Sequence, residues 1–355
     1  MEEITKELLY TAADAFSFDG QCTGISQNTE GHINDTTILT YCVQEQKKRY
    51  VLQRINTGIL NNPEELMENI VRVTSFLKEK ITAAGGDPLR ETLTVIPTRE
   101  GKTCFADEQG NYWRAYNYIE NTICYDKPDK PEYFYRSALA FGRFQNLLAD
   151  FPVETLHETI IGFHDTGKRF TQFQKAVSDD LAGRKHLVEQ EIEFLLKREA
   201  YTKSFDDRTD LPARVTHNDT KLSNVLFDRE TGDALCVIDL DTVMPGLSLH
   251  DFGDAIRFGA CSAAEDEPDL KKVAFDKKMY DLYREGYLEA CQEQLTKREI
   301  ELLPTGAKVI TYEQALRFLA DYLNGDIYYR TQRPEQNLDR TRTQLKLLTD
   351  MERMI

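Results

Sequence analysis

The stretch THNDTKLSNVLFD, residues 216–228, carries four polar side chains at fixed spacing: His217, Asp219, Lys221 and Asn224. It matches the pattern H-x-D-x-x-x-x-N, in which a loop presents the aspartate to a hydroxyl group and turns the asparagine toward a metal ion. We expect Asp219 to act as general base, or to orient an acceptor hydroxyl. Lys221 is placed to stabilise developing negative charge from the same loop. Asp219 and Lys221 are therefore the predicted catalytic residues.

A second acidic cluster follows at the end of an apolar strand, where the residues CVIDLD, 236–241, include Asp239 and Asp241. We predict Asn224, Asp239 and Asp241 as ligands of Mg²⁺, which prefers hard oxygen ligands completed by phosphate oxygens and water. For Asp241, a structural partner is the alternative. Such a site suits phosphoryl transfer from a nucleotide, which requires positioning and charge neutralisation and little covalent chemistry from the protein.

Two neighbouring features are interpreted as structural. We expect His217 to brace the loop through a hydrogen bond to the backbone, rather than to transfer a proton. The letters DFGD at 251–254 resemble a metal-binding motif of protein kinases, but they lie after the strand already assigned to that role. Asp251 or Asp254 is instead expected to cap a helix and to brace the catalytic loop.

Length and composition predict a folded protein of about two domains or lobes. The chain has 355 residues, of which 41% are hydrophobic and 29% charged. A formal net charge of −16 disfavours nucleic acid and anionic membranes as partners, because both attract basic proteins. The sequence lacks the pattern of a secretion signal and an apolar run of membrane-spanning length. We expect a cytoplasmic monomer.

The first third of the chain has the pattern of a small lobe built from strands and one long helix. The helix begins near Pro63 and places apolar residues at helical spacing. A shorter helix is predicted at 3–16. Five strands are predicted to form the sheet, at 38–43, 49–55, 93–97, 103–106 and 112–119.

We therefore predict a fold of the α+β class with two lobes, like that of protein kinases. The N-terminal nucleotide-binding lobe would cover residues 1–119, and the largely helical C-terminal lobe residues 120–355. The hinge would lie near 117–121, where Tyr118 and Glu120 are candidates to contact the nucleotide base through backbone groups.

Two segments of the small lobe are candidates to hold the nucleotide. The segment EGHINDT, 30–36, lies where a kinase places its phosphate-covering loop, but Gly31 is its only glycine, so an ordinary hairpin turn fits equally well. The strand at 49–55 carries Gln53 where a kinase keeps a lysine, with Arg54 on the opposite face. Either the nucleotide is held without that cation or Arg54 bends toward it.

The C-terminal lobe is predicted to be mainly helical. A late helix, 315–330, would carry Arg317, Asp321 and Tyr328 along one side. Such a face suits the recognition of a sugar, and an i,i+4 pair of Arg317 with Asp321 on a solvated face is an equal alternative. By its apolar pattern this helix is expected over 312–329. Other helices are expected at 132–148, 170–176, 185–201 and 277–292, and strands at 224–227 and 234–240.

With these motifs, the chain resembles the aminoglycoside-phosphotransferase-like small-molecule kinases, and within them it is similar to the N-acetylhexosamine 1-kinases. The likeness runs over nearly the whole chain and is carried by residues 217–228, 237–260 and 315–330. It implies the bilobal fold and ATP-dependent phosphorylation of the anomeric C1 hydroxyl of N-acetylglucosamine or N-acetylgalactosamine, with Asp219 as base. It also implies four contacts to the sugar substrate, from His32, Asn34, Arg317 and Tyr328.

Two other functions fit the same residues. The first is a kinase for a different small alcohol, such as choline, homoserine, an aminoglycoside or another sugar; the acidic charge of the chain favours a cationic acceptor, and Arg317 near the acceptor argues against one. The second is a nucleotide-binding scaffold without activity, suggested by Gln53 in place of lysine and by the single glycine of the loop. The complete set Asp219, Lys221, Asn224 and Asp239 argues against a scaffold.

Overall fold

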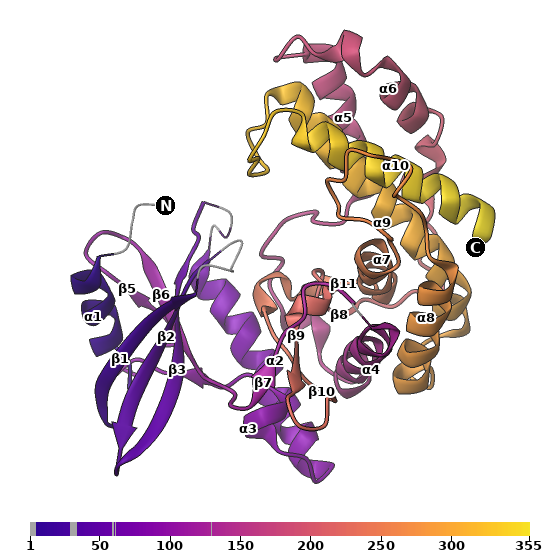
Figure 1. The fold of residues 1–355 in the computed structure, drawn as a ribbon. Coiled ribbons are helices and arrows are strands. Elements are labelled where there is room, and N and C mark those ends of the chain that lie inside the picture. The colour runs from indigo at the N-terminus through magenta and orange to yellow at the C-terminus, as the bar shows by residue number, and fades with distance from the viewer. Residues whose placement is uncertain (1–4, 29–33, 59, 61, 129) are drawn as a thin grey trace. The chain divides into compact units, whose positions relative to one another are not determined.

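The computed structural model describes residues 5–28, 34–58, 60, 62–128 and 130–355 (Figure 1). The chain divides into two compact units. The first contains residues up to Ile123 together with Asp150–Ile160 and Leu226–Met244, and the second contains Cys124–Ala149, Ile161–Val225 and Pro245–Ile355. An antiparallel sheet dominates the first unit and helices dominate the second, which confirms the predicted α+β fold class.

The sheet of the first unit runs in the order β1-β2-β3-β6-β4, and β5 also pairs with β6. All its pairings are antiparallel. In the described residues this sheet therefore has six strands where five were predicted. The prediction omitted the first strand, because glycines lie within and next to that segment. The strands are β1 (Gln21–Asn28), β2 (Asp35–Val43), β3 (Gln46–Ile55), β4 (Val95–Ile96), β5 (Phe105–Ala106) and β6 (Tyr112–Asn117).

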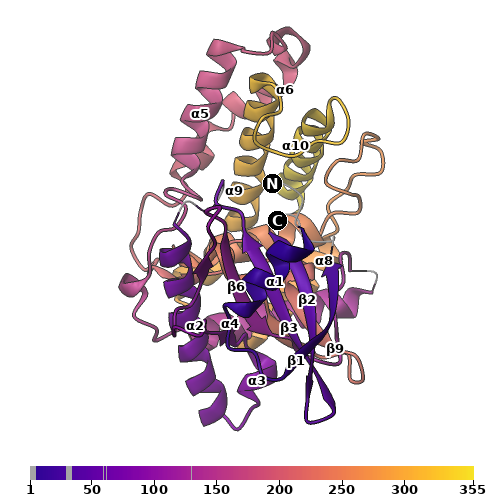
Figure 2. The same cartoon turned by 90° about the vertical axis from the view of Figure 1, so that its left-hand side faces the viewer.

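Helix α1 (Lys6–Asp14) covers one face of this sheet (Figure 2). Its apolar side packs with Tyr50 and Leu52 of β3 and with Trp113 of β6 in one buried cluster. Because successive side chains of a strand point to opposite faces, Gln53 of β3 lies on the face turned away from α1. The register pairs Gln53 with Arg114 of β6, so both side chains share that second face.

Helix α2 (Pro63–Ala83) has the expected apolar face, which buries Leu66, Ile70, Val73 and Leu77. It is capped by Asn62, whose side chain accepts the N–H of Glu65. A short helix follows, α3 (Pro88–Glu91).

The two later segments of the first unit are tied to α2 and to a small second sheet. The Asn69 side chain donates to the carbonyl oxygens of His157 and Val243, at 2.8 and 3.0 Å. Strand β7 (Thr122–Ile123) pairs with β9 (Val225–Asp228), which in turn pairs with β10 (Ala234–Val237). The first unit thereby extends beyond residue 119 and includes the segment of Asp239 and Asp241.

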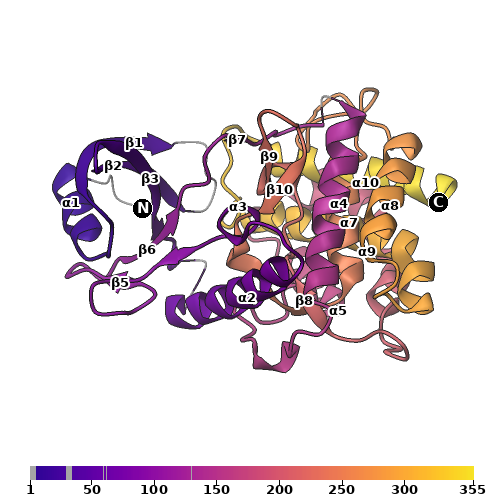
Figure 3. The same ribbon diagram turned by 90° about the horizontal axis from the view of Figure 1, so that it is seen from below.

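The second unit is built around close helix pairs, of which α4 with α8 and α7 with α9 are the most extensive (Figure 3). At Gly253 of α7 a β-carbon would lie 2.5 Å from the carbonyl oxygen of Gly306 in α9, so glycine is required for this approach. The helices are α4 (Pro131–Leu147), α5 (Thr166–Asp179), α6 (Glu189–Leu196), α7 (Ser248–Gly259), α8 (Lys277–Cys291), α9 (Lys297–Asn324) and α10 (Gln336–Met354), with the short strands β8 (Arg214–Thr216) and β11 (Met244–Gly246).

Two predicted helices differ from the structure. The helix expected at 185–201 is only the eight-residue α6 between 3₁₀ turns. The late helix begins earlier, at a capping box of Thr296 and Glu299, and it ends before Gly325, whose left-handed backbone closes it. Tyr328 therefore lies beyond the helix. No helix in the described ranges is long and apolar enough to cross a membrane.

Candidate active site

The loop that carries Asp219 is fixed by carboxylates of α7. Asp251 accepts the backbone N–H groups of His217 and Asn218, at 2.9 and 2.8 Å, and Asp254 accepts that of Thr220 at 3.0 Å. The predicted bracing role of both aspartates is confirmed, although they act from inside the helix rather than as its cap. Because backbone groups are held by buried carboxylates, the loop is rigid before any substrate binds.

His217 is fully buried and acts as the predicted brace. Its Nδ1 atom accepts the backbone N–H of Asp219 at 3.2 Å. Its ring lies edge-on to Phe141 and to Phe144 of α4, with centroid distances of 5.5 and 6.2 Å. The imidazole thereby fixes the backbone of the catalytic loop.

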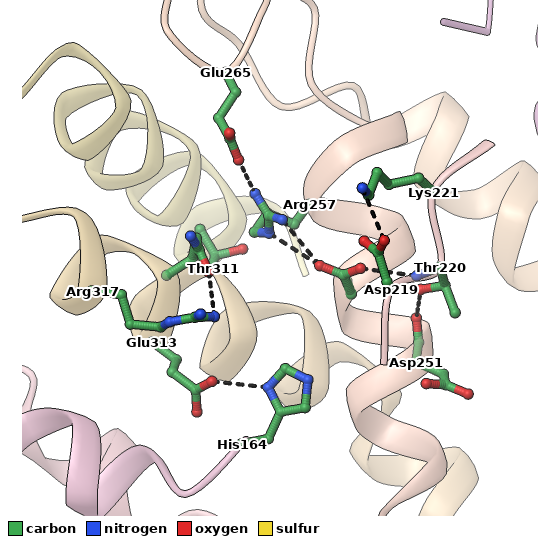
Figure 4. Close-up of polar contacts among 12 residues, drawn as sticks. His164, Asp219, Thr220, Lys221, Asp251, Arg257, Glu265, Thr311, Glu313 and Arg317 are labelled. Atoms are coloured by element: carbon green, nitrogen blue, oxygen red, sulfur yellow. Dashed lines mark hydrogen bonds and ion pairs between the residues drawn. The ribbon is translucent and has the colours of Figure 1, made fainter. Parts of the chain in front are cut away.

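Asp219 lies between a cation and an amide. Its Oδ2 atom is 2.9 Å from the Nζ atom of Lys221 and accepts the Asn224 side chain at 3.0 Å (Figure 4 shows the ion pair). Burial raises the pKa of Asp219, but Lys221, His217 and Asn224 outweigh burial and lower that pKa below its ordinary value. The carboxylate is therefore ionised at neutral pH and available to accept a proton or to orient a hydroxyl.

The residues predicted to bind metal differ in how well they fit Mg²⁺. The amide nitrogen of Asn224 also donates to the Asp219 backbone oxygen at 2.8 Å, an orientation that leaves its amide oxygen for a cation. Asp239 begins the turn Leu240–Thr242 in a left-handed conformation, with φ 60° and ψ 59°. Asn224 belongs to the second unit and Asp239 to the first.

Asp241 is held by protein donors instead. Its Oδ1 atom forms a buried ion pair with Arg114, and its Oδ2 atom accepts the side-chain amide of Asn34 at 2.5 Å. With both oxygens engaged, this geometry favours the alternative of a structural partner for Asp241, and its assignment as a metal ligand stays a prediction without support from these contacts.

The predicted nucleotide residues lie on different faces of the sheet. Gln53 contacts Thr36 and Arg114, on the face away from α1. Arg54 lies on the α1 face, where it pairs with Asp35 at 2.7 Å and is 4% exposed. The structure therefore does not bring Arg54 to the side chain of Gln53.

At the predicted hinge, Arg49 of β3 holds both candidate residues. Its guanidinium group lies over the ring of Tyr118, 4.0 Å from the centroid, and forms a two-pronged ion pair with Glu120. The backbone N–H of Tyr118 donates to the carbonyl oxygen of Arg49 at 3.2 Å. Gly31 and His32, the other predicted ligands of this lobe, lie outside the described residues.

Of the predicted sugar contacts, Arg317 and Tyr328 come together in the second unit. The Arg317 guanidinium lies 5.4 Å from the ring centroid of Phe163, 6.0 Å from that of Tyr328 and 5.6 Å from that of Tyr329. Burial lowers the pKa of Arg317, but Tyr329, Tyr328 and Glu313 outweigh burial and raise it. Within the described part of the chain no carboxylate lies within ion-pair distance of Arg317.

Asp321 has a different role from the one its helical spacing suggested. Its carboxylate accepts the backbone N–H groups of Ile327, Tyr328 and Tyr329, at 2.8 to 3.0 Å, and the side chain of Asn337. Asp321 therefore fixes the aromatic segment that follows α9, and it does not pair with Arg317.

Arg114 is the functional candidate that the motifs missed. It contacts two residues that had been predicted separately, Gln53 and Asp241, and Asp241 in turn accepts the side chain of Asn34. The available signal was a single arginine within the apolar strand YWRAYN, 112–117, because an arginine is rarely buried without a partner.

Comparisons with known proteins bear on the family and the fold of the chain. A model of the phosphotransferase enzyme family matches residues 24–286. An aminoglycoside phosphotransferase from Alicyclobacillus acidocaldarius superposes with a TM-score of 0.63 at 11% identity, over 99% of this chain and 97% of that one.

Two further solved structures are similar. Spectinomycin phosphotransferase, in complex with ADP and spectinomycin, gives a TM-score of 0.61 at 12% identity over 99% of both chains. The GDP complex of aminoglycoside 2'-phosphotransferase-IIIa gives 0.63 at 14% identity, over 98% of this chain and 99% of that one. At such identities the likeness shows the fold, which is the bilobal, protein-kinase-like one.

Proposed function

Because the chain belongs to the phosphotransferase enzyme family, we propose that it transfers the γ-phosphoryl group of ATP to the anomeric C1 hydroxyl of N-acetylglucosamine or N-acetylgalactosamine, with Mg²⁺. The observation that carries the transfer chemistry is the ionised Asp219, held between Lys221 and Asn224 on a braced loop. The sugar acceptor is supported by the resemblance of the sequence and by the cluster of Arg317 with aromatic rings.

The proposed reaction needs few chemical groups from the protein. The oxygen of the C1 hydroxyl forms a bond to the γ-phosphorus of ATP, and the bond from that phosphorus to the bridging oxygen breaks, so ADP leaves. Asp219 orients the hydroxyl and accepts its proton, which then passes to solvent. Its low pKa makes Asp219 a weak base, which suits a loose transition state in which the proton leaves late.

Lys221 and Asn224 support the same step. Lys221 neutralises charge on the transferred phosphoryl group, and it can do so after exchanging its ion pair with Asp219 for a phosphate oxygen. Asn224 would offer its amide oxygen to Mg²⁺, which would neutralise the phosphates of ATP, and Asp239 stays a predicted ligand of that ion.

The charges near Arg317 bear on the alternative acceptors. Arg169 lies close enough for Arg317 to lower its pKa, in addition to the lowering by burial, and no carboxylate of the described residues pairs with Arg169. Two guanidinium groups in this region disfavour choline, ethanolamine or an aminoglycoside, because a cationic acceptor would meet like charge. Neutral sugars with hydroxyl and amide groups are compatible with both arginines.

The proposal is tested by incubating the protein and Mg²⁺ with each of several acceptors, using ATP and GTP in separate series. The acceptors are N-acetylglucosamine, N-acetylgalactosamine, glucose, choline, homoserine and kanamycin, and the release of ADP or GDP is measured. We expect kcat/KM with ATP to be at least about tenfold higher for an N-acetylhexosamine than for any cationic acceptor, since each factor of ten requires about 1.4 kcal/mol of differential binding. Greater turnover of choline or kanamycin would overturn the proposed acceptor and leave the phosphotransferase assignment intact.

A further inference from the structure

Arg114 is a buried cation in the middle of the nucleotide-lobe sheet. It is 1% exposed and lies on β6, with its side chain on the face turned away from α1. An arginine is seldom buried in a strand unless each of its donors finds an acceptor. Its partners therefore define what it does.

Arg114 bridges the sheet and the segment that follows β10. Its Nε atom donates to Gln53 at 2.9 Å, and Gln53 in turn donates to Thr36 of β2 at 2.9 Å. Its Nη1 atom forms the ion pair with Asp241. A ladder of polar side chains thus crosses three strands and ends on Asp241, which is 127 residues away in the sequence.

The same segment carries Asp239, two residues before Asp241. Burial lowers the pKa of Arg114, but Asp241, Tyr116 and Asp239 together with the hydrogen bonds outweigh burial and raise that pKa, so the Asp239 carboxylate lies within electrostatic reach of the guanidinium. The left-handed backbone of Asp239, with φ 60°, is unfavourable for an aspartate and persists only where the surroundings determine it. Asn34 also helps to hold Asp241 in place, because it donates to Asp241 and accepts the backbone N–H of Asn56 at 3.0 Å.

We propose that Arg114 is the positioning residue that takes the place of the missing third-strand lysine, and that its ion pair with Asp241 holds Asp239 where it can bind the Mg²⁺ of Mg·ATP. Gln53 occupies the position of that lysine on β3. Its cross-strand neighbour on β6, Arg114, donates a hydrogen bond to it and supplies the positive charge that Gln53 lacks. This inference rests on the proposed function, because Asp239 is taken as the metal ligand.

The Arg114–Asp241 ion pair explains how Arg114 can fix the turn. Without Arg114, the buried carboxylate of Asp241 would lose its positively charged partner, and the local structure would have to rearrange. Such a rearrangement displaces the turn that begins at Asp239.

The test compares nucleotide binding by variants in the absence of any acceptor. Calorimetry gives the Kd of ADP with Mg²⁺ and without it for Arg114→Met, Asp241→Asn and the matched control Arg214→Met. Arg214 also forms an ion pair with a buried carboxylate, that of Glu299 at 2.6 Å, but it belongs to the second unit. Thermal unfolding of each variant shows whether it is folded.

We expect Arg114→Met and Asp241→Asn to weaken the binding of Mg·ADP at least about tenfold, and the binding of ADP alone by less than about threefold, because the metal contributes only when Asp239 is in place. Arg214→Met should leave both affinities within about twofold of those of the wild type. Equal losses in Arg214→Met and Arg114→Met, or Mg·ADP binding by Arg114→Met within twofold of the wild type, would overturn the inference.

A second experiment moves the positive charge from Arg114 on β6 to position 53 on β3, and so tests directly whether Arg114 replaces the lysine. In the Arg114→Met background, Gln53→Lys returns a cation to the third strand, and we expect the affinity for Mg·ADP to recover to within about threefold of the wild type. No gain over Arg114→Met alone would contradict the replacement of a lysine by Arg114. If Arg114→Met does not fold, Arg114→Gln, which is uncharged but can still donate hydrogen bonds, takes its place with and without Gln53→Lys. Because no acceptor is present, these results stand even if the protein turns over no hexosamine.

Discussion

At Asp219, burial and a neighbouring cation act in opposite directions on the pKa, and the cation prevails. The residues responsible are close in sequence, within 217–224, which explains why the motif alone could predict them. Arg114 could not be predicted in the same way, because its ion pair joins two segments that no local pattern relates. Contacts across a sheet depend on register, which sequence spacing alone does not provide.

The role of Asp219 is tested by Asp219→Asn, which keeps the size of the side chain and removes its charge. We expect kcat to fall at least about 10²-fold, because the variant cannot accept the proton of the acceptor hydroxyl. Asp206→Asn, at an exposed position of the same unit, is the control. Steady-state rates with N-acetylglucosamine provide the measurement, and a kcat for Asp219→Asn near that of the wild type would remove Asp219 from the chemistry.

Among the elements, α9 shows which features of a helix can be predicted from its apolar spacing and which cannot. The amphipathic helices α4 and α8 were predicted close to their observed ends because the apolar spacing is regular. The start of α9 was missed because Pro304 lies inside the helix, and proline normally ends one. Its end was missed because the carboxylate of Asp321 accepts hydrogen bonds from the backbone N–H groups that follow the helix. Sequence spacing does not predict these hydrogen bonds.

The segment after α9 yields a prediction for Asp321→Ala. The variant leaves the backbone N–H groups of Ile327, Tyr328 and Tyr329 without their acceptor, which should cost about 1–3 kcal/mol of unfolding free energy. Because Tyr328 then loses its fixed position beside Arg317, we expect KM for the sugar to rise several-fold while KM for ATP stays unchanged. Asp179→Ala removes only a surface pair with Lys175 and is the control. An unchanged KM for the sugar would show that this segment does not contact the acceptor.

For the whole molecule, the composition and length indicated two lobes, and the structure has two compact units. The boundary between them was beyond sequence reading, because residues 150–160 and 226–244 return to the first unit through contacts with α2 and β7. The net charge of −16 does not determine the charge around the acceptor, since Arg317 and Arg169 lie near each other, with the carboxylate of Glu313 close to both.

The central claim, transfer to the anomeric hydroxyl of an N-acetylhexosamine, is tested most directly by comparing free N-acetylglucosamine with its methyl glycoside. The glycoside keeps every group of the sugar except the free C1 hydroxyl. With Mg·ATP, phosphorus NMR of the free-sugar reaction should show a phosphate coupled to the anomeric proton, and the glycoside should remain unphosphorylated because it has no hydroxyl at C1. Phosphorylation of the glycoside at a comparable rate, or a free-sugar product with phosphate on another carbon, would contradict the account.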